Sequence, residues 1–149
     1  MSTDFEELQE LILADARDIY SEIVIDHAMA PRNLGVMQDA NGYARVTGSC
    51  GDTMAVWLKG NTYIIAAATF MTDGCGPSVA SGSMVTEMAR GQSIGGALKM
   101  TQCDVLDSLG GLPDESKHCA LLATDTLKAA IRDYITTKRE PWKRVYRKY

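Results

Sequence analysis

The sequence lacks an apolar run long enough to cross a membrane. Its longest stretches without a charged residue, 60–72 and 74–86, have thirteen residues each, whereas a spanning helix needs about 20. The N-terminus also lacks a basic region followed by an apolar run, and its first ten residues hold four acids. Secretory signals and transit peptides have the opposite pattern. We therefore expect a cytoplasmic protein with no membrane partner.

The chain also lacks an excess of basic residues. Its 149 residues include 15 Lys and Arg against 19 Asp and Glu, for a net charge of −4. The charge is uneven, because residues 138–149 hold six basic side chains and one acid. A nucleic-acid-binding protein needs a broad basic face, so the acidic body argues against a nucleic-acid partner. The basic tail, residues 138–149, suggests at most a local contact with an acidic partner.

No two of the four cysteines form a C-x-x-C pair, which excludes a thioredoxin-type redox site and a zinc ribbon. Disulfides are rare in a reducing compartment. A chain of 149 residues with 46% apolar residues can also build a core without them. The cysteines therefore need another explanation.

The hydrophobic pattern predicts one domain over residues 1–149, without repeats or low-complexity segments. Thr3 and Glu6 form a capping box, and apolar residues follow at helical spacing, so we expect a helix over about residues 3–28. The pattern then changes to β-branched and aromatic runs, which predict strands at 43–47, 54–59 and 63–70. The pair Gly60-Asn61 predicts a tight hairpin. The three strands should form an antiparallel meander.

The rest of the chain is predicted to be helical. Pro77 suits the first turn of a helix, which Gly91 should close. Two short helices are expected over 93–100 and 101–109, followed by a break and a long helix that starts near His118. Pro141 should end that helix.

Three cysteines stand in an unusual local context. Cys50 lies in a predicted loop with Asp52 two residues on, Cys75 lies between two glycines before a helix, and Cys119 follows His118 at a helix start. Helix N-termini favour thiolates, and thiolates with an imidazole and a carboxylate suit a thiophilic metal or an iron–sulfur cluster. These five residues are therefore predicted to form one site. The alternative is that each cysteine is a small buried apolar residue.

Cys103 and His27 lack that context. Cys103 lies inside a predicted short helix near Val105 and Leu106, and we expect it in the core. His27 lies near the end of the first predicted helix, where a capping or surface role is expected.

The motifs around the three cysteines resemble those of IscU/NifU-type iron–sulfur cluster assembly scaffolds, over roughly residues 18–136. The matching segments are Cys50-Gly51-Asp52, Asp73-Gly74-Cys75-Gly76, Gly110-Gly111-Leu112-Pro113 and His118-Cys119-Ala120-Leu121. The resemblance implies a single scaffold domain of the α+β class. In it, helices cover a three-stranded antiparallel sheet, and the cysteine loops converge at one end.

The resemblance also implies a scaffold rather than an enzyme. A cysteine desulfurase would deliver sulfur, iron would bind, and a labile 2Fe–2S cluster would form on Cys50, Cys75 and Cys119 before it passes to apo-proteins. The fourth position then falls to Asp52 or His118. A carboxylate oxygen is a poor partner for soft cluster iron, so such a bond should exchange readily. Three thiolates per chain also permit a cluster shared in a homodimer.

Other functions use the same residues. Zn²⁺ on the three thiolates would give a zinc-dependent sulfur acceptor of the SufU type, or a zinc-stabilised interaction module. SufU-type proteins carry an insertion between the first two cysteines that is missing here, and they generally lack the histidine that precedes Cys119 in this chain. Both differences favour the scaffold. A Cys/His/Asp hydrolase is the weakest alternative, because His118 adjoins Cys119 in the chain.

Overall fold

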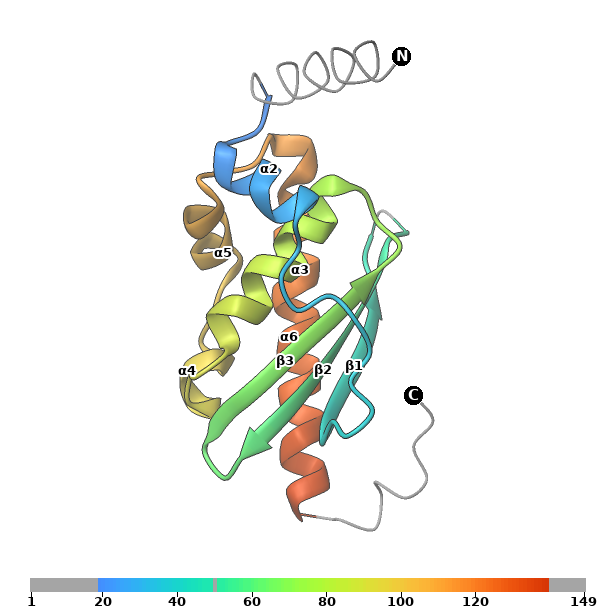
Figure 1. Ribbon diagram of the computed structural model, residues 1–149, viewed down its shortest axis with the longest axis vertical. Helices are drawn as coiled ribbons and strands as arrows, with labels where there is room; N and C mark the ends of the chain where they lie inside the picture. The colour runs from blue at the N-terminus through green and yellow to red at the C-terminus, as the bar shows by residue number, and fades with distance from the viewer. Residues whose placement is uncertain (1–18, 50, 140–149) are drawn as a thin grey trace, which may run out of the picture.

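The computed structural model describes residues 19–49 and 51–139, and in them a three-stranded sheet packs against several helices (Figure 1). The elements follow in the order α2 (Glu22–Met29), β1 (Gly42–Thr47), β2 (Thr53–Asn61), β3 (Ile64–Thr72), α3 (Gly76–Ala89), α4 (Ile94–Leu98), α5 (Gln102–Leu109), the 3₁₀-helix η1 (Asp114–Ser116) and α6 (Lys117–Arg139). The predicted α+β class is confirmed. Within the described ranges, no helix is long and apolar enough to cross a membrane.

The sheet is an antiparallel meander in the order β1-β2-β3. Since side chains alternate along a strand, β2 sends Met54, Val56 and Leu58 into the main core beneath the helices. Ala55 and Trp57 point to the opposite face, where they pack with residues of the segment before β1. That segment crosses in front of the sheet (Figure 1). The central strand is therefore buried on both sides.

Helices α3 and α6 lie on the inner face of the sheet, and α3 does so through small residues. Its buried positions are mostly Ala, Ser, Gly and Thr. A Cβ atom on Gly82 would lie 2.4 Å from the Phe70 ring, so the glycine permits the close approach of α3 to β3. The Phe70 ring of β3 fills the space that a side chain at position 82 would occupy.

Several local predictions are confirmed. Pro77 lies in the first turn of α3, and Gly91 follows its end with φ +80°. The short helix expected over 101–109 is α5, which begins with a capping box of Thr101 and Asp104 and ends at Gly110 in the left-handed conformation. The long helix starts at Lys117, one residue before His118. Its predicted end at Pro141 lies outside the described residues.

The predicted tight hairpin between the last two strands is confirmed, but its turn does not lie at Gly60-Asn61. Strand β2 continues through both residues, and the turn consists of Thr62 and Tyr63, with Thr62 at φ +58°. Gly60 serves packing instead, since a Cβ atom there would lie 2.5 Å from the ring of Tyr134 on α6. A glycine required for close approach was interpreted as a turn residue.

The predicted uninterrupted helix over residues 3–28 is also wrong. Helix α2 begins at Glu22, and Ser21 is extended, with ψ 159°, and caps it by accepting a hydrogen bond from the Val24 N–H. The Ser21 hydroxyl also donates to the Leu109 carbonyl at the end of α5. The capping box at Thr3 and Glu6 lies outside the described residues.

Candidate functional site

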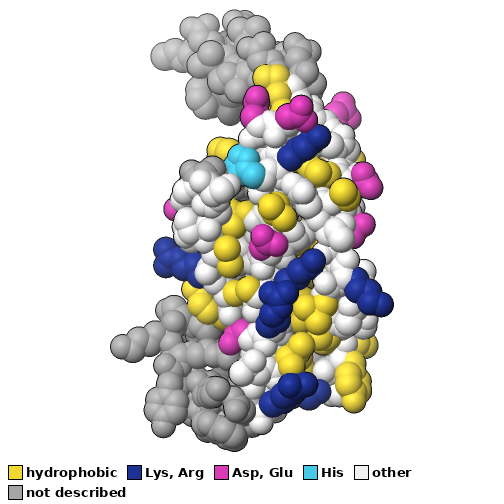
Figure 2. Space-filling model, turned by 180° about the vertical axis from the view of Figure 1, so that it is seen from behind, with side chains coloured by type: hydrophobic (Ala, Val, Ile, Leu, Met, Phe, Trp, Pro, Cys, Tyr) yellow, Lys and Arg dark blue, Asp and Glu magenta, His cyan; other side chains and the backbone are white. Residues whose placement is uncertain are grey.

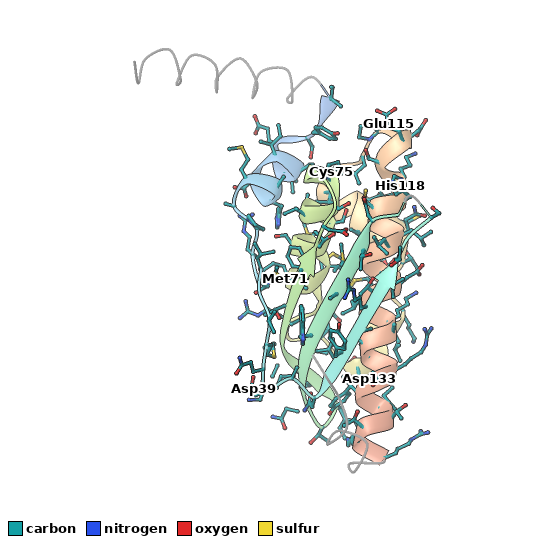
Figure 3. The ribbon with its side chains drawn as sticks, turned by 90° about the vertical axis from the view of Figure 1, so that its right-hand side faces the viewer. Asp39, Met71, Cys75, Glu115, His118 and Asp133 are labelled. Carbon is teal, nitrogen blue, oxygen red and sulfur yellow. The ribbon has the colours of Figure 1, made fainter. Side chains whose placement is uncertain are left out.

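One end of the sheet gathers the four predicted site residues that the structure describes, Asp52, Cys75, His118 and Cys119. There β2 begins beside the end of β3, with Met54 opposite Thr72, and both α3 and α6 begin close by. Figure 3 shows Cys75 and His118, from these two helices, at the same end of the molecule. The antiparallel meander thus brings together segments that lie far apart in the sequence.

Three of the five predicted residues form a compact group. The ligand atoms of Asp52, His118 and Cys119 all lie within 4.8 Å of one another. Cys119 Sγ lies 3.6 Å from His118 Nε2. Cys119 is almost fully buried, at 1% exposure, while Asp52 and His118 are half-buried. The group therefore has a fixed, enclosed sulfur on one side and two accessible ligands on the other.

Cys75 does not belong to that group of three. It is the N-cap residue of α3, its side chain makes no capping hydrogen bond, and it is exposed. Cys50 lies outside the described residues. The prediction that both cysteines join the same site therefore remains a prediction.

Asp52 is carried by a closed loop between β1 and β2. The Gly48 N–H donates to the Asp52 carbonyl at 2.8 Å, and the Gly51 N–H donates to the Gly48 carbonyl at 3.0 Å. Gly51 has φ +90°, which side-chain-bearing residues rarely adopt. This turn directs the carboxylate of Asp52 toward α6.

Ser78 is a member of the site that the sequence analysis missed. It is fully buried in the first turn of α3, and its Oγ lies 3.2 Å from Asp52 Oδ2 and 3.3 Å from Cys119 Sγ. Gly74 makes room for this arrangement, because a Cβ atom there would lie 2.5 Å from Ser78 Oγ. The position of Ser78, three residues after Cys75 at a helix start, places it on the same side of the helix.

The predicted core position of Cys103 is wrong. Its side chain is exposed on α5, whereas Val105 and Leu109 are fully buried. Those two residues are four apart and share one face of the helix. Cys103 is two residues from Val105 and therefore falls on another face. Val105, which favoured a core position for Cys103, is buried as expected, but it lies on a different face of α5 from the cysteine.

The predicted capping or surface role of His27 is also wrong. The side chain is only 9% exposed, and its Nδ1 lies 2.6 Å from Ser83 Oγ on α3. The same hydroxyl accepts a hydrogen bond from the Arg32 backbone N–H at 2.9 Å. Ser83 therefore joins α2, α3 and the loop after α2. Burial of the imidazole, followed by the charge of Arg32, holds the pKa of His27 below its ordinary value, against the opposing charges of Asp26 and Glu87.

We expect acid to destabilise the protein through His27. A histidine whose folded pKa is below the unfolded value of about 6.5 takes up its proton more readily in the unfolded chain. Its contribution to stability is present at pH 7 and is lost as the pH falls through the folded pKa. Urea unfolding at pH 7.5 and 5.5 should show a lower free energy of unfolding at pH 5.5. His27→Gln, which keeps a polar side chain, should reduce that difference, and an unchanged difference would contradict the assignment.

The donor set fits a thiophilic metal ion. One sulfur, one imidazole nitrogen and one carboxylate oxygen are ligands found at zinc and iron sites. Three protein ligands within 4.8 Å of one another can hold one tetrahedral ion and leave a fourth position open for a further ligand.

Comparison with known proteins gives a consistent result. A family model described as "NifU-like N terminal domain" matches residues 19–141. The iron-sulfur cluster assembly scaffold protein IscU of Aquifex aeolicus (strain VF5) is 44% identical over 119 residues, covering 78% of this chain and 76% of that protein. IscU of Escherichia coli (strain K12) is 44% identical over 126 residues, covering 81% and 97%.

Solved structures share the fold at lower identity. An N-terminal NifU-like protein from Brucella abortus aligns with a TM-score of 0.64 at 20% identity, covering 80% of this chain and 96% of that one. A protein described as a scaffold for the SUF system, from Fervidobacterium islandicum AW-1, aligns with a TM-score of 0.61 at 21% identity, covering 78% and 98%.

Proposed function

The chain belongs to the family of NifU-like N-terminal domains, and from that membership we propose that it serves as a scaffold on which an iron–sulfur cluster is assembled and later transferred. The observation that carries the proposal is the group of Asp52, His118 and Cys119, which lies at one end of the fold. Its ligands can hold cargo, and a carrier needs no further catalytic group.

The proposed ligands divide by their accessibility. Cys119 is buried on α6 and provides a fixed attachment point, whereas Cys75 is exposed at the start of α3 and can meet a sulfur donor. Cys50 would be the third thiolate of a 2Fe–2S cluster, with Asp52 or His118 in the fourth position. A cluster with three thiolates and one hard or borderline ligand is suited to temporary storage, because one bond exchanges more readily than the others. Zn²⁺ can bind the same ligands.

The surroundings of this end suit protein partners. Apolar side chains remain exposed just before α2, on α2 and near the start of α6, namely Ile19 at 59%, Ile23 at 44% and Leu121 at 44%. We propose that they contact a cysteine desulfurase and apo iron–sulfur acceptors in the cytoplasm, with a homodimer as one way to share the cluster. On the face shown in Figure 2, Lys and Arg side chains are scattered rather than gathered in one broad basic patch. That distribution does not favour a nucleic-acid partner.

Anaerobic reconstitution tests the proposed function. The purified protein is incubated with ferrous iron, a cysteine desulfurase, cysteine and a thiol reductant, which supplies the electrons that convert persulfide sulfur to sulfide, and then with an apo-ferredoxin. We expect the visible absorption of a 2Fe–2S centre, followed by its appearance in the acceptor. A colourless protein that holds one tight zinc ion and accepts persulfide sulfur would overturn the scaffold in favour of a zinc-dependent sulfur acceptor. Tight zinc without sulfur transfer would instead indicate an interaction module.

A further inference from the structure

We infer that Ser78 is a positioning residue that holds the Asp52 carboxylate in place for metal binding, an inference that rests on the proposed function of this site. Ser78 is fully buried, and its Oγ lies within hydrogen-bonding reach of both Asp52 Oδ2, at 3.2 Å, and Cys119 Sγ, at 3.3 Å. Its side chain thus joins two ligands that come from different elements of the fold.

The hydroxyl has one proton, so it donates to one of its two neighbours at a time. A carboxylate oxygen is a stronger acceptor than cysteine sulfur, which accepts hydrogen bonds only weakly. The proton of Ser78 is therefore directed to Asp52. Donation to the carboxylate fixes one of its oxygens and leaves the other available to a metal ion.

Asp52 needs such support more than Cys119 does. Cys119 is 1% exposed and part of a 23-residue helix, which holds its sulfur in place. Asp52 is half-buried and lies on the loop that turns at Gly51. Among the hydrogen bonds to the carboxylate in the described structure, the one from Ser78 Oγ joins it to a rigid helix.

Gly74 is a second feature of the same arrangement. A Cβ atom on Gly74 would lie 2.5 Å from Ser78 Oγ and 2.9 Å from Asp52 Oδ2. Both distances are too short for real atoms, so only glycine at this position lets the serine and the carboxylate approach each other. Gly74 thus leaves the space in which the Ser78 hydroxyl can donate its hydrogen bond to Asp52.

Binding of Co²⁺ to the metal-free protein tests this role, because it does not require a cluster to assemble. Groups that orient metal ligands typically contribute 10- to 100-fold in metal affinity. We expect Asp52→Ala and Ser78→Ala each to raise the dissociation constant of Co²⁺ by at least about tenfold. In the Asp52→Ala background, Ser78→Ala should change it by less than about twofold, since Ser78 acts through Asp52.

Ser81→Ala is the matched control. Ser81 is also fully buried on α3, but its hydroxyl donates to the Pro77 carbonyl at 2.7 Å and does not touch the site. It should leave Co²⁺ affinity and the visible Co²⁺ spectrum unchanged. Equal effects of the two serine substitutions would indicate a merely structural role and overturn the inference. The inference would also be overturned if Ser78→Ala weakened Co²⁺ binding by at least about tenfold in the Asp52→Ala background.

A measurement on the unmodified protein keeps the inference falsifiable if Ser78→Ala does not fold. In the metal-free protein, NMR couplings between Hα and the two Hβ protons of Asp52 should report one fixed rotamer, and rotamer-averaged couplings would overturn the inference. The proposed function fails separately, by the absence of a cluster after reconstitution. If the cluster forms normally but the dissociation constant of Co²⁺ is the same in all variants, the role of Ser78 is rejected while the proposed function stands.

Discussion

Replacement of Cys119 by serine is expected to abolish the 2Fe–2S cluster. Cys119 contributes the buried sulfur of the group with Asp52 and His118, and α6 fixes it in place. A serine hydroxyl is a hard, protonated oxygen and a poor ligand for soft cluster iron. Visible absorption after anaerobic reconstitution should therefore fall to the level of a sample without cysteine. Bound iron, measured per chain, should fall with it.

The other cysteines provide the comparison. Cys50→Ser and Cys75→Ser should give the same loss, because the proposed cluster uses all three thiolates. Cys103→Ser should keep the full absorption, since Cys103 lies on α5 and is not one of the three proposed thiolate ligands. A cluster retained in Cys119→Ser, or lost in Cys103→Ser, would contradict this ligand set. Far-ultraviolet circular dichroism of each variant separates loss of ligation from loss of the fold.

Much of the fold follows from local patterns that the structure preserves. The β-branched runs are strands, the capping box of Thr101 and Asp104 starts α5, and Pro77 lies in the first turn of α3. The errors arise where tertiary packing gives a residue a second use. Gly60 is a glycine because Tyr134 approaches the strand there. Ser21 interrupts the first helical pattern because its extended backbone caps α2.

The site could be predicted as a set of residues but not as a geometry. Local context at Asp52, His118 and Cys119 indicated ligands, yet only the meander and the two helix starts place their atoms within 4.8 Å. Ser78 escaped prediction because a serine in a helix start usually serves the helix itself. The role of Ser78 in the site depends on Asp52 and Cys119, which come from distant parts of the chain. Burial of His27 likewise depends on Ser83, 56 residues away.

Replacement of Asp52 by alanine is expected to make the assembled cluster more inert. The carboxylate is half-buried beside a buried sulfur, so it is the accessible hard ligand at which a chelator can enter. Without it, the neighbouring imidazole of His118 can take the fourth position, with a nitrogen that suits iron better. This prediction concerns the rate of cluster loss, whereas the Co²⁺ series concerns the equilibrium affinity of the metal-free site for a single ion.

The rate of bleaching in excess EDTA measures this effect. We expect Asp52→Ala to lose its visible absorption at least several-fold more slowly than the unmodified protein, and to transfer its cluster to apo-ferredoxin correspondingly slowly. Asp73→Ala is the matched control, because Asp73 lies at the same end of the sheet but accepts its hydrogen bond from the Thr53 N–H. Its rate should equal that of the unmodified protein. Equal rates for Asp52→Ala and the unmodified protein would show that the exchangeable ligand is not Asp52. The double variant Asp52→Ala/His118→Ala would then show whether the imidazole is the exchangeable ligand.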